Sequence, residues 1–186
     1  LSTCEVQSIC DYLANPNGSI NIYENANGCN NVPEIANSCG VPLSCLPYGN
    51  YYFFTQTDID SFQYDFPNCT ELQGYITIYG SDITSLNGLN PITSIEGELN
   101  IIYTALPSLT GLEGLASIGG SLMISENAAL NNLTGLEGLA SIGGILYVSR
   151  NIALNSLTGL DNIDSESITD LYIIDNNLLS TCAAQS

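Results

Sequence analysis

Twelve residues of this chain, LTGLEGLASIGG, occur at 109–120 and again unchanged at 133–144. Weaker copies flank them, LNGLNPITSIEG at 86–97 and LTGLDNIDSESI at 157–168. A repeat of 23–24 residues forms one coil, and a coil cannot bury its apolar side alone, so neighbouring coils must stack. The repeat therefore predicts a solenoid, in which an extended surface rather than a catalytic pocket carries the function.

Each coil contains a short strand core with two apolar positions that should face inward. These pairs are Ile76 and Ile78, Leu99 and Ile101, Leu122 and Ile124, Leu146 and Val148, Leu171 and Ile173. Five parallel strands of this kind should stack about 4.8 Å apart. One polar residue comes three positions after the second inward residue of each strand, and these residues form a polar row along the stack. Their side chains should form hydrogen bonds with turn backbone groups that would otherwise be buried without a partner. Its members are Ser81, Thr104, Asn127, Asn151 and Asn176.

One glycine recurs in every L-x-G-L segment of the repeats, where a tight bend or a close backbone approach would exclude a side chain. These glycines are Gly88, Gly111, Gly135 and Gly159. The leucine after each glycine should fill the core.

The segments before the coils of residues 71–178 are predicted to be caps. Residues 40–70 lack the repeat signature, and Cys45 and Cys69 bracket them at a separation suited to closing one coil. We interpret them as an N-terminal cap with a short helix starting at Thr57. Residues 1–39 should form a second cap with a helix over 5–13 and a strand in SINIY, and such a segment would cover the pairing edge at the open end of a solenoid.

The composition excludes several classes of partner. Nineteen acidic residues face a single basic residue, Arg150, and the formal charge of −18 would repel phosphate backbones and anionic lipid surfaces. No apolar run is long enough to span a bilayer, so we expect neither a nucleic-acid partner nor membrane insertion. Seven cysteines and no histidine favour disulfides outside the reducing cytosol, and a set of buried free thiols is the alternative.

The alternation of L-x-I strands, Asn turns, L-T-G-L and S-I-G-G resembles the receptor L-domain type of leucine-rich repeat, particularly the secreted tandem forms of Bacteroidota. The resemblance implies a β-rich, right-handed, parallel β-helix-like solenoid with disulfide-stapled caps. In that family an array opens with a cap like TQTDIDSF…YPNCT, here FPNCT at 66–70, and closes with a segment like LSTC-x-x-QSICDYL…GC. Here the closing segment comes first, so residues 1–39 are expected to be the C-terminal cap of a preceding array.

The sequence LSTCAAQS at 179–186 matches LSTCEVQS at 1–8 in six of eight positions, so residues 179–186 are expected to begin the next cap. Cys45 should pair with Cys69. The resemblance favours Cys4 with Cys29, which leaves Cys10 for Cys39. Cys182 is then the counterpart of Cys4 and should pair with a cysteine of the next unit.

Catalysis without histidine or lysine would depend on carboxylates and tyrosines, so we expect no enzyme and no cofactor. A paired-carboxylate glycosidase is the enzymatic alternative. Its candidate residues are Asp58, Asp60 and Asp65, or Asp161, Asp164, Glu166 and Asp170. The same clusters offer oxygen ligands for calcium, but no D-x-D-x-D-G loop is present. Candidate glycosylation sites are Asn17, Asn68 and Asn132.

Residues that flank the two buried positions of each strand must face the opposite way. The apolar ones are Tyr75, Tyr79, Ile102, Met123, Ile145, Tyr147, Tyr172 and Ile174, interleaved with Thr77, Asn100, Ser121, Ser125 and Ser149. A contiguous apolar strip on a highly charged protein predicts a contact surface. Two alternatives are that caps or loops fold over the strip, or that these residues satisfy strand preference alone.

Together these features favour an extracellular or cell-surface structural or adhesive protein, repeated head to tail along a fibre or stalk. Its expected partners are copies of itself, and lateral contacts would use the apolar strip. The alternative is an extracellular module whose strand face binds a glycan or a peptide, and a surface protein is a further possible partner.

Overall fold

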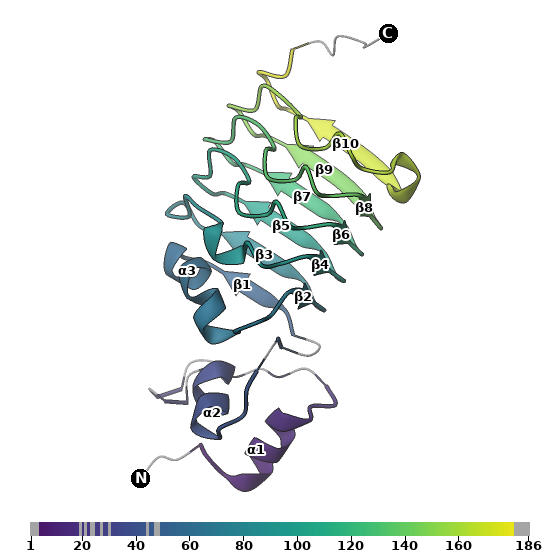
Figure 1. Ribbon diagram of the computed structural model, residues 1–186. Coiled ribbons are helices and arrows are strands. Elements are labelled where there is room, and N and C mark those ends of the chain that lie inside the picture. The colour runs from purple at the N-terminus through teal and green to yellow at the C-terminus, as the bar shows by residue number, and fades with distance from the viewer. Residues whose placement is uncertain are drawn as a thin grey trace.

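The computed structural model describes residues 4–18, 20, 22, 25–26, 28–29, 31–43, 45–46 and 49–180. From β1 to β9 its strands alternate along the sequence between two parallel sheets, and Figure 1 shows them stacked between an N-terminal helical segment and the C-terminal end. The strand predicted in SINIY falls largely outside the described residues, and Cys182 falls outside them altogether.

Sheet A contains six strands, each parallel to its neighbours, in the order β1-β3-β5-β7-β9-β10. Their bounds are Tyr51–Phe53 (β1), Ile76–Tyr79 (β3), Leu99–Ile102 (β5), Leu122–Ser125 (β7), Ile145–Ser149 (β9) and Asp170–Ile174 (β10). The sequence predicted five of them. The sixth, β1, comes from the predicted cap, where the aromatic residues Tyr51 and Phe53 take the inward positions that aliphatic residues hold in the other coils.

Sheet B consists of four two-residue strands in the order β2-β4-β6-β8, which the sequence did not predict. Their bounds are Glu71–Leu72 (β2), Ser94–Ile95 (β4), Ser117–Ile118 (β6) and Ser141–Ile142 (β8). The second residue of each is buried. Four successive coils therefore contribute one strand to each sheet, and their leucines and isoleucines fill the space between the sheets.

Three helices precede the coils: α1 (Gln7–Ala14), α2 (Val32–Ser38) and α3 (Gln56–Asp65). Two short 3-10 turns, η1 (Asn87–Leu89) and η2 (Ser165–Ser167), lie within the coils. The prediction that a helix starts at Thr57 is wrong, because the hydroxyl of Thr55 accepts from the N–H of Asp58 while the Asp58 carboxylate accepts from the N–H of Thr55. This capping box sets the start at Gln56. Thr57 and Asp60 are three residues apart, as Thr55 and Asp58 are, so the spacing alone did not show which threonine caps the helix.

The inward strand positions are buried in the first four coils, where none of the eight predicted side chains is more than 3% exposed. The prediction is wrong for the last coil, because Leu171 is 58% and Ile173 is 41% exposed. These two side chains lie in register with buried Leu146 and Val148. They are exposed because β10 ends sheet A, and no further coil of the described residues covers them.

The polar row forms a buried ladder of side-chain hydrogen bonds. The Oδ1 of Asn127 accepts from the N–H of Thr104 at 2.9 Å and from its hydroxyl at 2.7 Å, and the Oδ1 of Asn151 accepts from the Asn127 N–H at 3.0 Å. Asn176 continues the ladder in the last coil. Each amide also donates to the carbonyl of a strand residue in the preceding coil, as Asn127 does to Ile101 at 2.9 Å. Ser81 is exposed, so the ladder starts at Thr104.

The recurring glycines mark close contacts between successive coils. Gly111, Gly135 and Gly159 have φ values of 110°, 111° and 115°, a region that side chains disfavour. A Cβ on Gly135 would also collide with the carbonyl group of Leu109 in the preceding coil. The coils can therefore stack at this position only if it carries no side chain.

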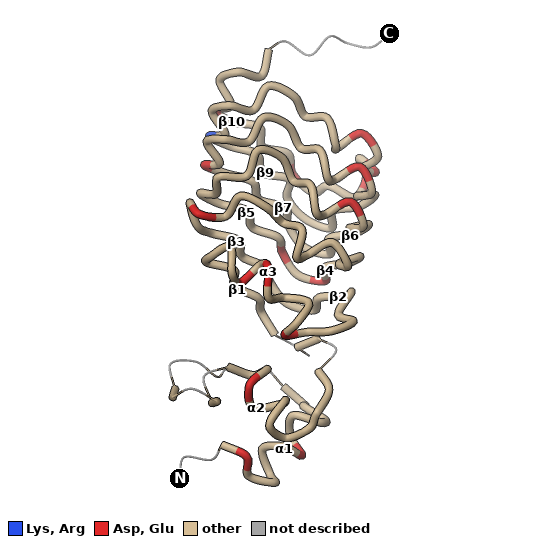
Figure 2. The backbone as a smooth tube through the Cα atoms, turned by 60° about the vertical axis from the view of Figure 1, so that its left-hand side comes forward, with Lys and Arg blue, Asp and Glu red and all other residues tan. Residues whose placement is uncertain are grey.

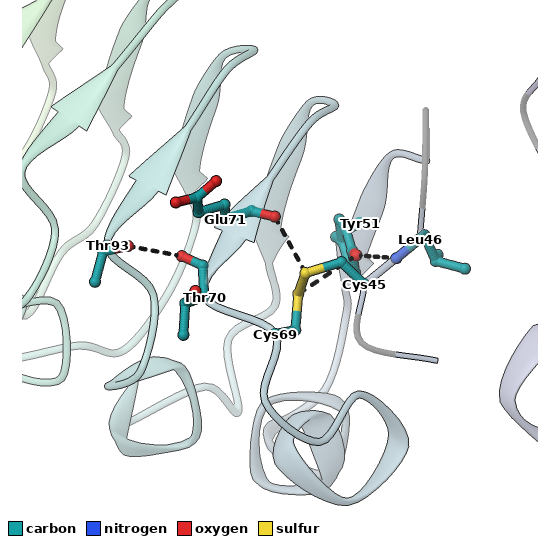
Figure 3. Close-up of a disulfide and its surroundings, with 7 residues drawn as sticks. All are labelled: Cys45, Leu46, Tyr51, Cys69, Thr70, Glu71 and Thr93. Carbon is teal, nitrogen blue, oxygen red and sulfur yellow. Dashed lines mark hydrogen bonds between the residues drawn. A yellow bond between two sulfur atoms is a disulfide. The ribbon is translucent and has the colours of Figure 1, made fainter. Parts of the chain in front are cut away.

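Three disulfides join Cys4 to Cys29, Cys10 to Cys39 and Cys45 to Cys69, which are the three pairs expected within one unit. The third lies against Tyr51, whose hydroxyl oxygen is 3.9 Å from the Sγ of Cys69 and accepts from the N–H of Leu46 at 2.7 Å (Figure 3). Burial raises the pKa of Tyr51 to about 12, although the Leu46 hydrogen bond lowers it in part. This disulfide thus ties the start of β1 to the segment that leads into β2.

Candidate binding face

The outer face is the side of sheet A that points away from the core, and two rows of side chains follow it from strand to strand. The middle row contains Tyr52, Thr77, Asn100, Met123, Tyr147 and Tyr172. The second row contains Tyr79, Ile102, Ser125, Ser149 and Ile174. Strand alternation places both rows opposite the buried positions.

The eight apolar residues of the predicted contact strip differ in exposure. Tyr75, Tyr79, Tyr172 and Ile174 are exposed, whereas Ile102, Met123, Ile145 and Tyr147 are half-buried. No described cap or loop covers the strip completely. Ser125 and Ser149, which were expected on the same face, are buried, because their short side chains lie between Ile102 and Ile174 in the second row.

Three exposed aromatic residues of this face were missed in the sequence: Tyr52, Phe54 and Tyr103. Tyr52 and Phe54 stack with ring centroids 6.0 Å apart, and Tyr103 stacks on Tyr79 at 5.6 Å. The run YYFF at 51–54 alternates inward and outward as a coil strand does, and this was the available signal. Tyr103 follows β5 with φ at +55°, a turn that carries its ring beside Tyr79.

The middle and second rows hold no charged residue, whereas acidic residues border them. Glu126 and Asp175 follow β7 and β10 and lie beside Arg150, at 3.4 Å and 3.9 Å between charged atoms. Both ion pairs are well exposed and contribute little to stability. Other acidic residues recur in successive coils at one side of the stack (Figure 2).

One acidic row of the coils has a structural role in the glycine turns. Glu113, Glu137 and Asp161 each accept from the N–H of the glycine two residues earlier, at 2.9, 2.7 and 3.3 Å. Asp164 accepts from the N–H of Glu166 at 3.0 Å at the start of η2. These contacts engage the carboxylates of Asp161 and Asp164, two of the four candidate catalytic residues of the last coil. Glu166 takes part only through its backbone N–H, and Asp170 is exposed at the start of β10.

The other candidate carboxylates all lie on α3. Asp58 caps the helix and Asp60 accepts from the side chain of Gln56 at 2.9 Å. Asp65 accepts from the hydroxyl of Ser61 at 3.2 Å. Burial raises the pKa of Asp65, and the charges of Glu34 and Asp58 raise it further against the opposing effect of Ser61. Asp58 and Asp65 border a mostly apolar cleft of about 610 Å³ beside β1.

Within the part of the chain that the structure describes, no three His, Cys, Asp or Glu side chains come together as metal ligands would. The described helices include none that is both long and apolar enough to cross a bilayer. Of the candidate glycosylation sites, Asn17 and Asn68 are exposed. Asn132 is half-buried, and its Oδ1 accepts from the N–H of Thr134 at 3.1 Å.

The model of the receptor L domain matches residues 68–185, which is more than half of the chain and includes all strands from β2 to β10. The chain belongs to the receptor L-domain family. Receptor L domains are extracellular ligand-binding modules, and the three disulfides are consistent with such a location. A comparison with curated proteins finds no match.

Proposed function

We propose that this L domain is an extracellular module that binds an uncharged, extended ligand, in the first place a glycan, on the outer face of sheet A. One observation carries the proposal: the middle and second rows of that face hold no charged side chain in a chain with 19 acidic residues. Four positions of the two rows, those of Tyr52, Tyr79, Tyr172 and Ile174, are exposed, and an exposed position accepts a carboxylate at little cost. Contact with an uncharged partner gives a reason for keeping these rows free of charge.

The aromatic residues of the face have the chemistry that a sugar ring requires. Tyr52, Phe54, Tyr79 and Tyr103 are between 46% and 55% exposed, and they form two stacked pairs. Flat aromatic rings pack against the C–H side of a sugar, and tyrosine hydroxyls offer hydrogen bonds at the edge. The middle row begins with Tyr52 and ends with Tyr147 and Tyr172. Thr77 and Asn100 lie between these tyrosines in the row and add further hydrogen-bond donors and acceptors.

A basic peptide is the competing ligand, because the net charge of −18 attracts cations over a long range. The acidic residues, however, border the two rows rather than lie within them. Binding of a basic peptide would weaken as salt is added, whereas binding of a neutral glycan would change little. Salt dependence therefore separates the two ligands.

The test is a screen of neutral oligosaccharides, followed by calorimetric titration of the best binder. Tyr52→Ala and Tyr79→Ala should each weaken binding by about fivefold, since one aromatic contact contributes about 1 kcal/mol. The matched control is Tyr64→Ala, because Tyr64 lies on α3 and is 85% exposed. Equal binding by all three variants, or equal loss in the control, would contradict the proposal.

The fibre or stalk favoured by the sequence ranks second, because the family match does not support a fibre subunit. A specific observation keeps it as a candidate function: residues 1–8 recur at 179–186 with six of eight residues identical, as expected of a unit that repeats along a longer chain. Electron micrographs of the native material would show filaments with a regular axial repeat if this function holds, and separate particles if it does not.

A further inference from the structure

Four residues that directly follow strands of sheet A have a left-handed backbone conformation, and none of them is glycine. This left-handed row consists of Tyr103, Glu126, Arg150 and Asp175, whose φ values are 55°, 59°, 54° and 57°. The backbone N–H groups of Tyr103, Glu126 and Arg150 donate to carbonyls of the next coil at 3.1, 3.1 and 3.0 Å. These bonds continue the ladder of sheet A, so the row is held at the same place in each coil.

A left-handed conformation is unfavourable for most residues, because it brings the Cβ close to a carbonyl oxygen. Glycine adopts it freely, and asparagine and aspartate adopt it more easily than other residues do. The chain uses both solutions elsewhere, with Gly135 at +111° in the glycine turns and Asn68 at +68° near β2. Tyr103, Glu126 and Arg150 instead keep a long side chain in this conformation. Strain kept at successive positions indicates that the side chains themselves have a role.

The left-handed row borders the outer face beside its second row. Tyr103 stacks on Tyr79 of the second row, with ring centroids 5.6 Å apart. In the following coils Arg150 lies between Glu126 and Asp175, and the three charged side chains are 65%, 49% and 64% exposed. Ion pairs as exposed as these contribute little to stability. The stability of the fold therefore does not explain why charged residues occupy strained positions.

An arginine between two carboxylates has the hydrogen-bonding pattern that neighbouring sugar hydroxyls require. A hydroxyl can donate to the carboxylate of Glu126 while its oxygen, or that of the next hydroxyl, accepts from the guanidinium of Arg150. The contacts of Arg150 with Glu126 and Asp175 orient the guanidinium, so less side-chain freedom is lost on binding. Two negative charges and one positive charge give no advantage to an anionic sugar.

We propose that the left-handed row is the edge of the outer face that binds the hydroxyl groups of a neutral glycan. One sugar ring packs against Tyr79 and Tyr103, and adjacent free hydroxyls further along the glycan bond to Glu126 and Arg150. This inference rests on the proposed function and adds the residues that select among glycans. Polar groups built to bond a hydroxyl discriminate strongly against a sugar that does not supply it, whereas a stacked aromatic ring does not.

The test is calorimetric titration of the whole chain with cellohexaose, maltohexaose and mannohexaose, which are neutral and differ in linkage or in hydroxyl orientation. Glu126→Gly and Arg150→Gly should each weaken binding of the best of these probes about tenfold, the effect of losing one hydrogen bond to a charged group. The same variants should have a higher urea midpoint than the wild type, because glycine adopts φ values of 59° and 54° without strain.

The matched control is Asn68→Gly, since Asn68 has the same backbone conformation but lies near β2 of the other sheet. It should bind each probe as the wild type does. A urea midpoint that falls in Glu126→Gly and Arg150→Gly would overturn the inference, because these side chains would then serve the fold.

Tyr79→Ala separates this inference from the proposed function. If Tyr79→Ala loses affinity while Glu126→Gly and Arg150→Gly bind as the wild type does, the inference is wrong and the proposed function stands. Absence of binding by all three probes would overturn the inference, and an empty screen of neutral oligosaccharides would overturn the proposed function as well.

Discussion

Replacing Asn127 by alanine should destabilise the chain strongly, because this side chain is wholly buried and bonds two neighbouring coils. The substitution removes the acceptor of the Thr104 N–H and hydroxyl and the donor to the Ile101 carbonyl. A buried polar group left without a partner costs about 1–3 kcal/mol. The Thr104 hydroxyl can rotate to another acceptor, and the Ile101 carbonyl has a second lone pair. We therefore count the full cost for the Thr104 N–H and part of the cost for the other two groups. The expected loss is about 3–4 kcal/mol, which is a large fraction of the stability of a typical domain.

The assay is urea unfolding followed by far-UV circular dichroism under non-reducing conditions, so that the disulfides stay intact. The matched control is Asn131→Ala, since Asn131 is exposed and uses only backbone groups to bond Pro107 and Asn155. The control should change the free energy of unfolding by less than about 0.5 kcal/mol. A loss below about 1 kcal/mol for Asn127→Ala, or an equal loss in the control, would refute the role assigned to the ladder.

Three further substitutions test other parts of the coils. Gly135→Ala should lower the urea midpoint because φ is +111° and a Cβ would strike the Leu109 carbonyl, whereas Gly114→Ala, whose nearest neighbours would lie 3.4 Å away, should be tolerated. The raised pKa of Asp65 means that its contribution to stability is present in acid and lost as the pH rises, so Asp65→Asn should raise the urea midpoint at neutral pH and not in acid. Tyr51 has its pKa raised to about 12, so the wild type should lose stability between about pH 10 and that value, and Tyr51→Phe should lack this part of the loss.

Much of the coil architecture was predictable because it depends on a repeated local pattern. The positions of Ile78, Asn127 and Gly135 recur at a fixed spacing. Ile78 and Asn127 each meet their own equivalent in the next coil, and Gly135 lies against the backbone of the preceding coil, as the equivalent glycines do. In a stack of repeats, equivalent positions of successive coils therefore have the same surroundings. For this reason the strands of sheet A, the polar row and the glycine turns could be predicted from the repeat.

The elements that were missed depend on contacts that the repeat does not encode. The strands of sheet B are two residues long and exist only because an adjacent coil pairs with them. In β1, Tyr51 and Phe53 hold core positions without the aliphatic signature. The start of α3 was misplaced because Thr55 and Thr57 offer the same capping pattern, and contacts of α3 with η1 are available only in the folded chain.

The candidate face was predicted in part for the same reason. Strand alternation put Tyr79 and Tyr172 on the outer side, but it did not show that Tyr103 stacks on Tyr79 or that Tyr52 belongs to the face. Exposure was also decided by neighbours, since Ser149 faces outward in the register and is 3% exposed.

By itself the sequence determined that this chain builds parallel coils with a core of leucine and isoleucine, a buried asparagine ladder and side-chain-free turns, because those features repeat at 23–24-residue intervals. Only the tertiary structure decided which outward residues are accessible and which carboxylates serve as caps of helices and turns. Those properties depend on neighbours that are distant in sequence. Ser149 faces outward as Tyr79 does, yet its neighbours in the second row bury it, whereas Tyr79 is 46% exposed.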